Sequence, residues 1–428
     1  MKYVAIILAG AAGEPAEALG GKTPLEAATL PNLTRLAAAG RVGCAYTLPE
    51  DLPPAPEVAA MSILGYSPLE FPVGRAALEA LGAGVQLRAG EWVLRVSFVT
   101  MGEVEEEAGL LVDASPEGLT EREARVLLTD LLGHWRATQP QLVGGLSIAP
   151  GTGKRLMLVD GSGASYQKVM TSPPIAAWQE AVKDHWPSGG AEGTRLRRLM
   201  ESSQAFLSRH EVNLARAEQG LRPANMAWLW GQGTAVTLPP LKERLGVRGL
   251  MFSGDEAVGG LAVAAGLDRQ PVFCGLDGDE LGLDALAEAV SDGLRRADLV
   301  CCYLEEPLHA SLRGDPHEKV AVLEQVDARL IGPLIRDLDE SYGDPAADAG
   351  AEGWRALVIS DVTASSERRQ VLGGPVPFVM AGAWVRSVLE RPFTEESAAA
   401  SDLQINPGHE LMEYFLRGGL ASVRARAR

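Results

Sequence analysis

Cysteines, aromatic residues and basic residues are all scarce in this chain of 428 residues. The four cysteines, at positions 44, 274, 301 and 302, are too few for a disulfide framework and lack the C-x-x-C spacing of zinc and redox sites. This usage is typical of a reducing compartment, and we expect a cytoplasmic protein. Cys301 and Cys302 stand in a run of small apolar residues, so we interpret them as part of a buried strand and not as reactive thiols.

The shortage of basic residues excludes one class of partner. Lysine and arginine total 39 against 56 aspartates and glutamates, which gives a net charge of −17. Nucleic-acid binders need a basic stripe that releases counterions, so we expect no nucleic-acid partner. No apolar run approaches the roughly 18 residues of a membrane span, so we expect no membrane association either. The apolar start, residues 1–11, is short and leads directly into a motif that uses it as a first strand, which argues against a signal peptide.

Hydrophobic runs and helical stretches alternate along most of the chain. Residues 3–8 form a near-continuous apolar, β-branched run that ends in small residues, as a buried strand does. Proline near the start and glycine after the end predict short helices around residues 23–28 and 31–39. Further strands are expected at 249–253, 272–275, 299–304, 356–359 and 376–380, with helices such as 284–296 and 319–330 between them. This order predicts an α/β core, a mainly parallel sheet with helices on both faces.

The middle of the chain has a different order of predicted strands and helices from both ends. Residues 88–100 and 110–113 have the pattern of antiparallel strands, and a helix is expected from 121 to about 135. We therefore expect an inserted α+β cap domain over residues 81–226, between the two parts of a core domain over 1–80 and 227–428.

Several segments, in order, carry a resemblance that spans nearly the whole chain. They are residues 20–28, 30–37, 40–43, 61–66, 74–80, 212–214, 223–226, 230–233, 314–320 and 375–378. In these segments the chain resembles the archaeal-type, cofactor-independent phosphoglycerate mutases. The resemblance implies an alkaline-phosphatase-like core with a cap, and a glycolysis-related activity that interconverts 2- and 3-phosphoglycerate through a phosphoserine. It also implies two divalent metals, such as manganese or zinc, in active members.

That chemistry needs a serine oxygen as nucleophile, with carboxylates and imidazoles that hold two cations. The resemblance places Ala9 where the family has a metal-binding aspartate, and Pro56 at the nucleophilic serine. The family's other metal ligands fall on Leu308, Leu312, Asp361, Val362 and Val371. Only Asp361 keeps a ligand side chain, so we expect a lost metal site, no bound cofactor and no catalytic residues.

The cap also departs from the family. A His-Asp pair that reaches toward substrate in the family is replaced by Ile175-Ala176, after Thr171-Ser-Pro-Pro174. Arg75 and Arg155 remain as candidates for binding an anion, a small phosphorylated or carboxylate ligand. The alternative for each is an ordinary structural or surface arginine.

Three hypotheses for function stay open. The first is a pseudoenzyme with a binding, scaffold or regulatory role, which self-associates, pairs with an active homologue or binds a small anion. The second is an active metal-dependent mutase or phosphatase with displaced ligands, which His309, Asp315 and His317 or Glu14 and Glu57 would supply. The third is a different metal-free reaction, but no Ser-His-Asp or Cys-His arrangement supports it.

Overall fold

The chain forms two compact units in a computed structural model, which describes residues 1–102, 105–149, 155–271, 282–345, 348–385 and 389–417. The first unit comprises Met1–Pro72 together with Thr237–Arg428, and the second comprises Val73–Val236. Each unit is described by itself.

An eight-stranded sheet, ordered β15-β2-β14-β11-β1-β10-β8-β9, forms the centre of the first unit. Its strands are β1 (Lys2–Leu8), β2 (Arg41–Ala45), β8 (Gly249–Ser253), β9 (Asp268–Pro271), β10 (Leu299–Leu304), β11 (Trp354–Ser360), β14 (Val376–Gly382) and β15 (Gln404–Ile405). Only β14 pairs antiparallel with its neighbours, so the expected mainly parallel sheet is confirmed. The strand expected at 272–275 lies outside the described residues. A small hairpin of β12 (Thr363–Ser365) and β13 (Gln370–Leu372) follows β11.

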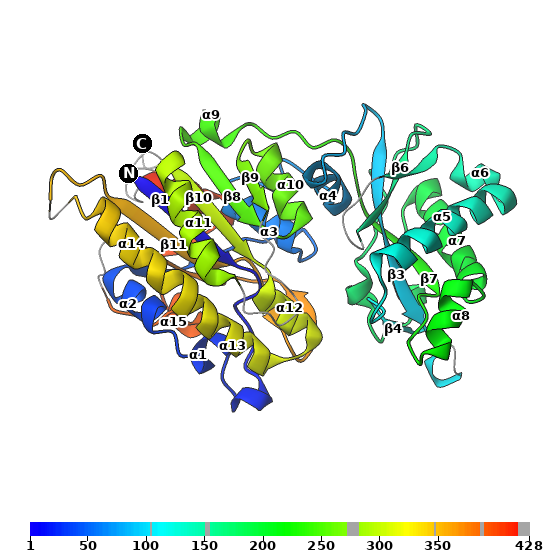
Figure 1. Ribbon diagram of the computed structural model, residues 1–428, viewed down its shortest axis with the longest axis horizontal. Coiled ribbons are helices and arrows are strands. Elements are labelled where there is room, and N and C mark those ends of the chain that lie inside the picture. Colours follow the sequence, from blue (N-terminus) through cyan, green and yellow to red (C-terminus); the bar gives the residue numbers. More distant parts are fainter. Residues whose placement is uncertain (103–104, 150–154, 272–281, 346–347, 386–388, 418–428) are drawn as a thin grey trace. The chain divides into compact units, whose positions relative to one another are not determined.

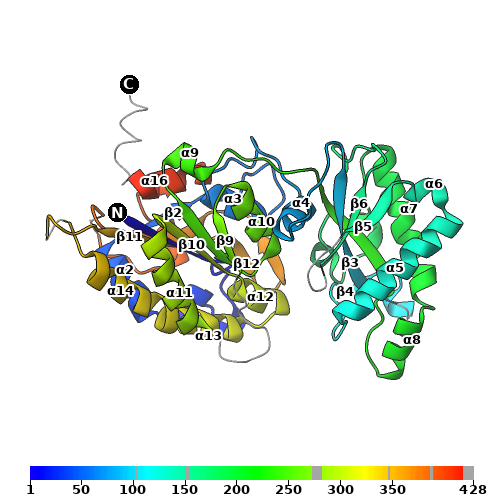
Figure 2. The same ribbon diagram turned by 45° about the horizontal axis from the view of Figure 1, so that its top comes forward.

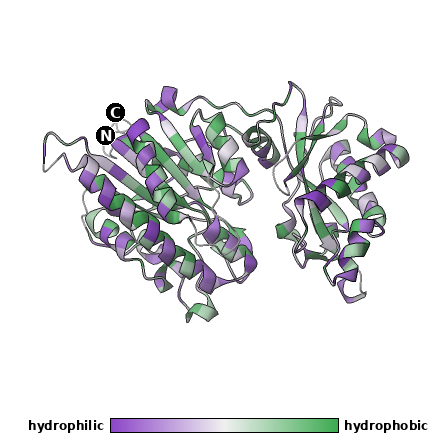
Figure 3. Ribbon diagram, viewed as in Figure 1, coloured by the Kyte–Doolittle hydropathy of each residue, from purple (hydrophilic) through white to green (hydrophobic). Residues whose placement is uncertain are grey.

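Helices cover both faces of this sheet (Figures 1 and 2). Val4, Ile6 and Leu8 of β1 pack into one large core with the helices on their side, whereas the Tyr3 ring on the other face contacts Phe415, with ring centroids 5.7 Å apart. The strands are the most hydrophobic elements, and the helices show hydrophilic outer faces (Figure 3). The helices are η1 (Glu17–Leu19), α1 (Pro24–Ala27), α2 (Pro31–Ala39), α3 (Pro56–Ile63), α9 (Leu241–Leu245), α10 (Glu256–Ala264), α11 (Leu283–Arg296), α12 (Glu306–Arg313), α13 (Pro316–Val326), η5 (Asp327–Ile331), α14 (Gly332–Tyr342), α15 (Glu395–Ala399), η6 (Gly408–Glu410) and α16 (Leu411–Arg417).

The helix expected at 319–330 is longer than predicted and contains a wide turn. It starts at Pro316 and continues through the π-helical segment η5 into α14. Pro333 has no N–H to donate, and the amide of Gly332 bonds instead to the carbonyl of Asp327, five residues back. The buried Asp327 carboxylate accepts bonds from the amides of Asn32 and Leu33, at 3.0 and 2.7 Å. It thereby caps the start of α2, whose own preceding residue supplies no side-chain cap.

The second unit is an antiparallel five-stranded sheet with helices. Its elements are α4 (Arg75–Gly82), β3 (Trp92–Met101), η2 (Glu105–Glu107), β4 (Leu111–Asp113), α5 (Glu121–Thr138), α6 (Pro140–Val143), β5 (Leu146–Ala149), β6 (Leu156–Asp160), η3 (Pro174–Ala177), η4 (Val182–His185), α7 (Gly190–Leu207), α8 (Glu211–Glu218) and β7 (Met226–Gly233). Strand order is β4-β3-β6-β5, and β7 pairs with β3. Thr120 begins α5 with a capping box closed by Glu123. Leucines on the inner face of that helix pack with Trp135 into the core of this unit.

The structure places the boundaries of this unit at 73 and 236, where the sequence suggested 81 and 226. The alanines of α4 pack with Val93 of β3 and Met157 of β6. The other boundary moves because Met226 opens β7, which pairs with β3. The two ends of the unit meet: a Cβ on Gly74 would lie 1.9 Å from the carbonyl oxygen of Gln232. Glycine is required there by this close approach.

Two further expectations concern burial. Cys301 and Cys302 are buried in β10, as predicted, and burial raises the pKa of the Cys301 thiol to about 12. Cys274 lies outside the described residues. Within the described part of the chain, no helix combines the length and apolar character that a membrane crossing requires.

Candidate functional site

Three of the positions that the resemblance assigns to metal ligands, Ala9, Leu308 and Asp361, follow the carboxyl ends of adjacent strands. Strand β1 lies between β10 and β11 and runs parallel to both, with Leu8 opposite Leu304 and Ser360. The loops that follow these strands therefore emerge at one edge of the sheet. Ala9 and Asp361 come directly after β1 and β11, and Leu308 follows β10 in α12.

Asp361 is fully buried, and its carboxylate is surrounded by hydrogen-bond donors. Oδ1 accepts from the amides of Gly10 and Val362, at 2.8 and 2.6 Å. Oδ2 accepts from the Tyr303 hydroxyl at 2.7 Å. Burial raises the pKa of this carboxyl to about 6, while the bonds from Gly10, Tyr303 and Val362 act in the opposite direction. The one ligand-type side chain that remains is thus engaged by the protein itself.

Apolar side chains fill the space beside Asp361. A Cβ placed on Gly10 would lie 3.0 Å from Cδ1 of Leu308 and 2.9 Å from Cβ of Ala364, so these groups already contact the loop. Val362 packs with Leu48 and Ala59, and Val371 joins them from β13. Leu312 lies in the last turn of α12, where it is half-buried.

Pro56, to which the resemblance assigns the position of the nucleophilic serine, is the first residue of α3. It has neither a hydroxyl nor an N–H, and its predecessor Ala55 provides no side-chain cap.

These side chains do not fit a pair of divalent cations. Hard cations need several oxygen or imidazole ligands each. The expected positions offer one carboxylate, which already accepts three hydrogen bonds, among alanine, leucine, valine and proline. Among the residues that the structure describes, no three His, Cys, Asp or Glu side chains gather in a metal-binding group.

A buried lysine, Lys319, and a half-buried glutamate, Glu395, hold the loop after β1, and neither was singled out from the sequence as functional. Lys319 Nζ donates to the carbonyls of Ala12 and Ala364, at 3.0 and 3.1 Å. Glu395 accepts from the Gly13 amide at 2.9 Å and from the Thr23 hydroxyl at 2.8 Å. Burial lowers the pKa of Lys319 to about 7, opposed by the charges of Glu395 and Asp361. Because the polar groups of the loop are bonded to these two side chains, the protein itself holds the loop in place.

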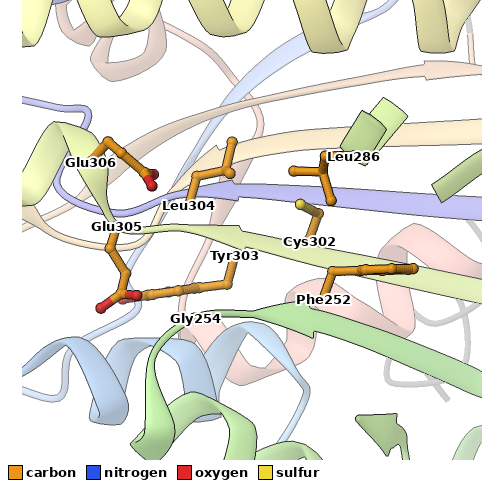
Figure 4. Close-up of a pocket in the computed structure, with 8 residues that line it drawn as sticks. All are labelled: Phe252, Gly254, Leu286, Cys302, Tyr303, Leu304, Glu305 and Glu306. Atoms are coloured by element: carbon orange, nitrogen blue, oxygen red, sulfur yellow. The ribbon is translucent and has the colours of Figure 1, made fainter. Parts of the chain in front are cut away.

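A small cavity opens at the carboxyl ends of β8 and β10, next to Tyr303 (Figure 4). Its volume is about 30 Å³, which is room for roughly two water molecules. Phe252, Leu286, Cys302 and Leu304 line it together with Glu305 and Glu306. A phosphoglycerate does not fit into this space.

The residues of the displaced-ligand hypothesis do not come together as a metal site. Asp315 caps α13 by accepting the Glu318 amide at 2.8 Å. His309 Nε2 lies 3.8 Å from Oε1 of Glu305 one turn earlier, and His317 is exposed.

The two glutamates of the same hypothesis also have separate surroundings. Glu14 pairs with Arg368 at 3.3 Å. Glu57 is buried in the first turn of α3.

Arg75 belongs to a cluster of arginines in the second unit. Its Nε donates to Oε1 of the fully buried Glu79 at 3.0 Å, and Arg95 pairs with the same oxygen. The pKa of Arg95 is lowered by burial and by the charges of Arg75 and Arg155, and raised by Glu79. The Arg95 guanidinium also lies over the Trp230 ring, 5.4 Å from its centroid. Two guanidiniums thus pair with one carboxylate, and the charge of a third, Arg155, acts on Arg95.

Two atoms of this cluster have no hydrogen-bond partner within the described residues: Oε2 of Glu79 and Nε of Arg95. Both are buried, so each carries the cost of an unmade bond. Sequence reasoning named Arg75 and Arg155 but missed Arg95 and Glu79. Glu79 stands four residues after Arg75 on one helix, which is the spacing of a helical ion pair. This spacing is visible in the sequence and could have predicted that Glu79 pairs with Arg75.

The segment that replaces the family's His-Asp pair is tied to β7. The Thr171 hydroxyl donates to Oε1 of Gln232 at 2.7 Å and accepts from the Gly231 amide at 3.1 Å. Ile175 and Ala176 lie in the short helix η3, both half-buried. This segment provides no titratable side chain at the two positions.

Comparison with known proteins decides the family. The chain is 33% identical over 421 residues to the 2,3-bisphosphoglycerate-independent phosphoglycerate mutase of Methanothrix thermoacetophila, covering 98% of this chain and 100% of that protein. It belongs to the 2,3-bisphosphoglycerate-independent phosphoglycerate mutase family. A probable phosphoglycerate mutase of the same type from Geobacter sulfurreducens is also 33% identical, over 97% of this chain and all of its own. The model of this mutase family matches residues 37–213.

Solved structures support the fold. The PH0037 protein of Pyrococcus horikoshii has a TM-score of 0.70 at 24% identity, covering 97% of this chain and 96% of its own. A cofactor-independent phosphoglycerate mutase of Thermoplasma acidophilum has a TM-score of 0.53 at 23% identity, covering 98% and 100%. The expected fold class, an alkaline-phosphatase-like α/β core, is confirmed, and so is the resemblance to the mutase family.

Proposed function

We propose that this chain is a phosphoglycerate-mutase-like pseudoenzyme of the cytoplasm, which has lost the metal site and binds a small anion without turning it over. The observation that carries the proposal is the state of Asp361. Its carboxylate accepts from Tyr303, Gly10 and Val362, in a site otherwise occupied by apolar side chains. Phosphoryl transfer depends on a nucleophile and on cations that neutralise the phosphoryl oxygens, and these side chains supply neither.

The anion would bind at the arginine cluster of the second unit. Arg75, Arg95 and Arg155 carry three positive charges against the single charge of Glu79. An anion would reduce the repulsion between the guanidiniums and could accept from the unpaired Arg95 Nε. A phosphorylated or carboxylate ligand suits this arrangement.

A mutase assay tests the loss of catalysis. The protein should neither interconvert 2- and 3-phosphoglycerate nor hydrolyse a simple phosphate ester, with or without added manganese, cobalt or zinc. Metal-dependent turnover by the unmodified protein, abolished by Asp361→Ala, would show instead that an active site with displaced ligands exists.

Restoring single residues should not recover activity. The variants Ala9→Asp and Pro56→Ser each return one group of a unit whose members act together, so each should give no measurable turnover. Clear activity in either single variant would contradict the proposal, because it would mean that the rest of the site is intact.

Thermal unfolding tests the anion site. Inorganic phosphate should raise the melting temperature of the protein, since a ligand that binds only the folded state stabilises it. Arg155→Gln should abolish the rise. Arg197→Gln is the control, because it removes the same charge from the same unit at an arginine that pairs with Glu201. An equal rise in both variants would overturn the assignment of the arginine cluster.

A further inference from the structure

A pocket with two arginines lies in the first unit, at the end of the sheet opposite to Asp361. It has a volume of about 270 Å³ and is lined by Arg41, Val42, Leu389, Arg391, Ala400, Ser401 and Asp402. Arg41 is the first residue of β2, which runs parallel to β15. Both β2 and β11 run antiparallel to β14, so β2 and β11 run in the same direction. The pocket is therefore at the amino ends of the parallel strands, whereas Asp361 follows the carboxyl end of β11.

The two arginines of this pocket have most of their hydrogen-bonding capacity unused. Within the part of the chain that the structure describes, Arg391 has no hydrogen-bond or ion-pair partner. Among the same residues Arg41 bonds through Nη2, which lies 3.2 Å from both carboxylate oxygens of Asp402. The Asp402 side chain is 86% exposed, and an exposed ion pair of this kind is weak and easily replaced. An incoming oxyanion can thus meet two guanidiniums.

The surrounding groups favour an anion with an apolar part. Val42, Ala400 and the exposed Leu389 provide an apolar wall and rim. The carbonyls at the end of α15 would repel an anion, but Gln404 Nε2 bonds those of Ala398 and Ser401, at 3.2 and 2.9 Å.

The volume is slightly below the range of about 300–1,000 Å³ for typical small-molecule sites, which indicates a small ligand. We propose that this pocket binds a small organic oxyanion, a carboxylate or phosphate joined to a short apolar group. The oxyanion lies between Arg41 and Arg391, and the apolar group contacts Val42 and Leu389.

The chain has a net charge of −17, so an anion enters against the overall charge and depends on these two arginines. The proposal is independent of the anion site proposed above, which lies in the other unit.

Calorimetric titration with phenylphosphonate and with benzoate tests the proposal, and the two probes show whether the pocket prefers phosphate-like or carboxylate ligands. Arg391→Gln should weaken binding by about tenfold, the loss of one charge-assisted hydrogen bond. Because Arg391 has no partner among the residues that the structure describes, this variant should keep the melting temperature of the parent. Asp402→Asn should tighten binding about twofold, since it removes the carboxylate that competes for Arg41.

Two controls distinguish binding by Arg391 from a general effect of charge and from binding of the ring alone. Arg295→Gln removes an equal charge from a surface pair on α11 and should leave the affinity unchanged. Phenol, which keeps the ring without the charge, should not bind measurably. The proposal is overturned if Arg391→Gln leaves both affinities unchanged or if phenol binds as tightly as phenylphosphonate. Binding lost only in Arg155→Gln would overturn this pocket while supporting the arginine cluster, and absence of any binding would overturn both.

Discussion

Removing the Tyr303 hydroxyl probes how Asp361 is held. In Tyr303→Phe the carboxylate loses the donor at 2.7 Å, and Asp361 is fully buried, so the carboxylate is not exposed to bulk solvent. A hydrogen bond to a charged group contributes about 1.5–3 kcal/mol, and one between neutral groups about 1 kcal/mol. Asp361 has a pKa of about 6 in the folded protein. The variant should therefore lose about 2–3 kcal/mol of unfolding free energy at pH 8 and about 1 kcal/mol at pH 5.

Urea unfolding at the two pH values measures this difference. Tyr3→Phe is the matched control, because the Tyr3 hydroxyl donates to the uncharged carbonyl of Leu416 at 3.0 Å. Its loss should cost about 1 kcal/mol at both pH values. Equal losses at pH 5 and pH 8 in Tyr303→Phe would refute the reasoning. So would a divalent cation that stabilises the parent through Asp361, since that carboxylate would then be a metal ligand.

Protonation of the Asp361 carboxyl should make the unfolding free energy depend on pH. Its folded pKa of about 6 is above the ordinary value of 3.8, so the folded state binds its proton first as pH falls. Stability from this group should therefore rise between about pH 6 and pH 4, by roughly 3 kcal/mol. Asp361→Asn keeps the shape and should remove this rise. In that variant Oδ1 accepts from Gly10 and Val362, and Nδ2 donates to the Tyr303 oxygen.

Two further predictions concern buried charges. Lys319 has a pKa lowered to about 7 from 10.5, so its contribution to stability should increase from about pH 7 upward. Lys319→Met, which removes this dependence, should cost less relative to the parent at pH 6 than at pH 9 in urea unfolding. Asp327→Ala should cost about 2–3 kcal/mol, because it leaves buried amides at the start of α2 without an acceptor. A loss under about 0.5 kcal/mol, the level of an ordinary surface change, would contradict the capping role.

Local patterns were sufficient to predict most of the core strands. The apolar run at 3–8 and the proline and glycine around 31–40 act within a few residues, and the structure has β1 and α2 there. The boundaries at 73 and 236 were missed because α4 and the end of β7 have no unusual composition. They join the second unit through packing of small residues, such as Gly74 against Gln232.

The sequence predicted which positions of the candidate site differ from the family, but not how their surroundings are built. The sequence and the family resemblance were enough to name Ala9, Pro56 and Leu308 as unsuited to the chemistry. The partners of Asp361 were not predictable, because Gly10 and Asp361 are 351 residues apart in the chain. Tyr303 was available as a signal, since it is the one polar side chain among the last residues of an apolar strand. Lys319 was noticed only as part of the resemblance, and its burial depends on loops that follow β1 and β11.

The meeting of the two ends of the second unit has a consequence for protein engineering. Gly74 and Gln232 are in contact, so the ends of the segment Val73–Val236 are already close together in space. Closing such ends with a short linker costs little chain entropy. The segment can therefore be excised, circularly permuted or exchanged for that of an active relative as one block. The turnover of such chimaeras would show which unit determines activity, without a single point mutation.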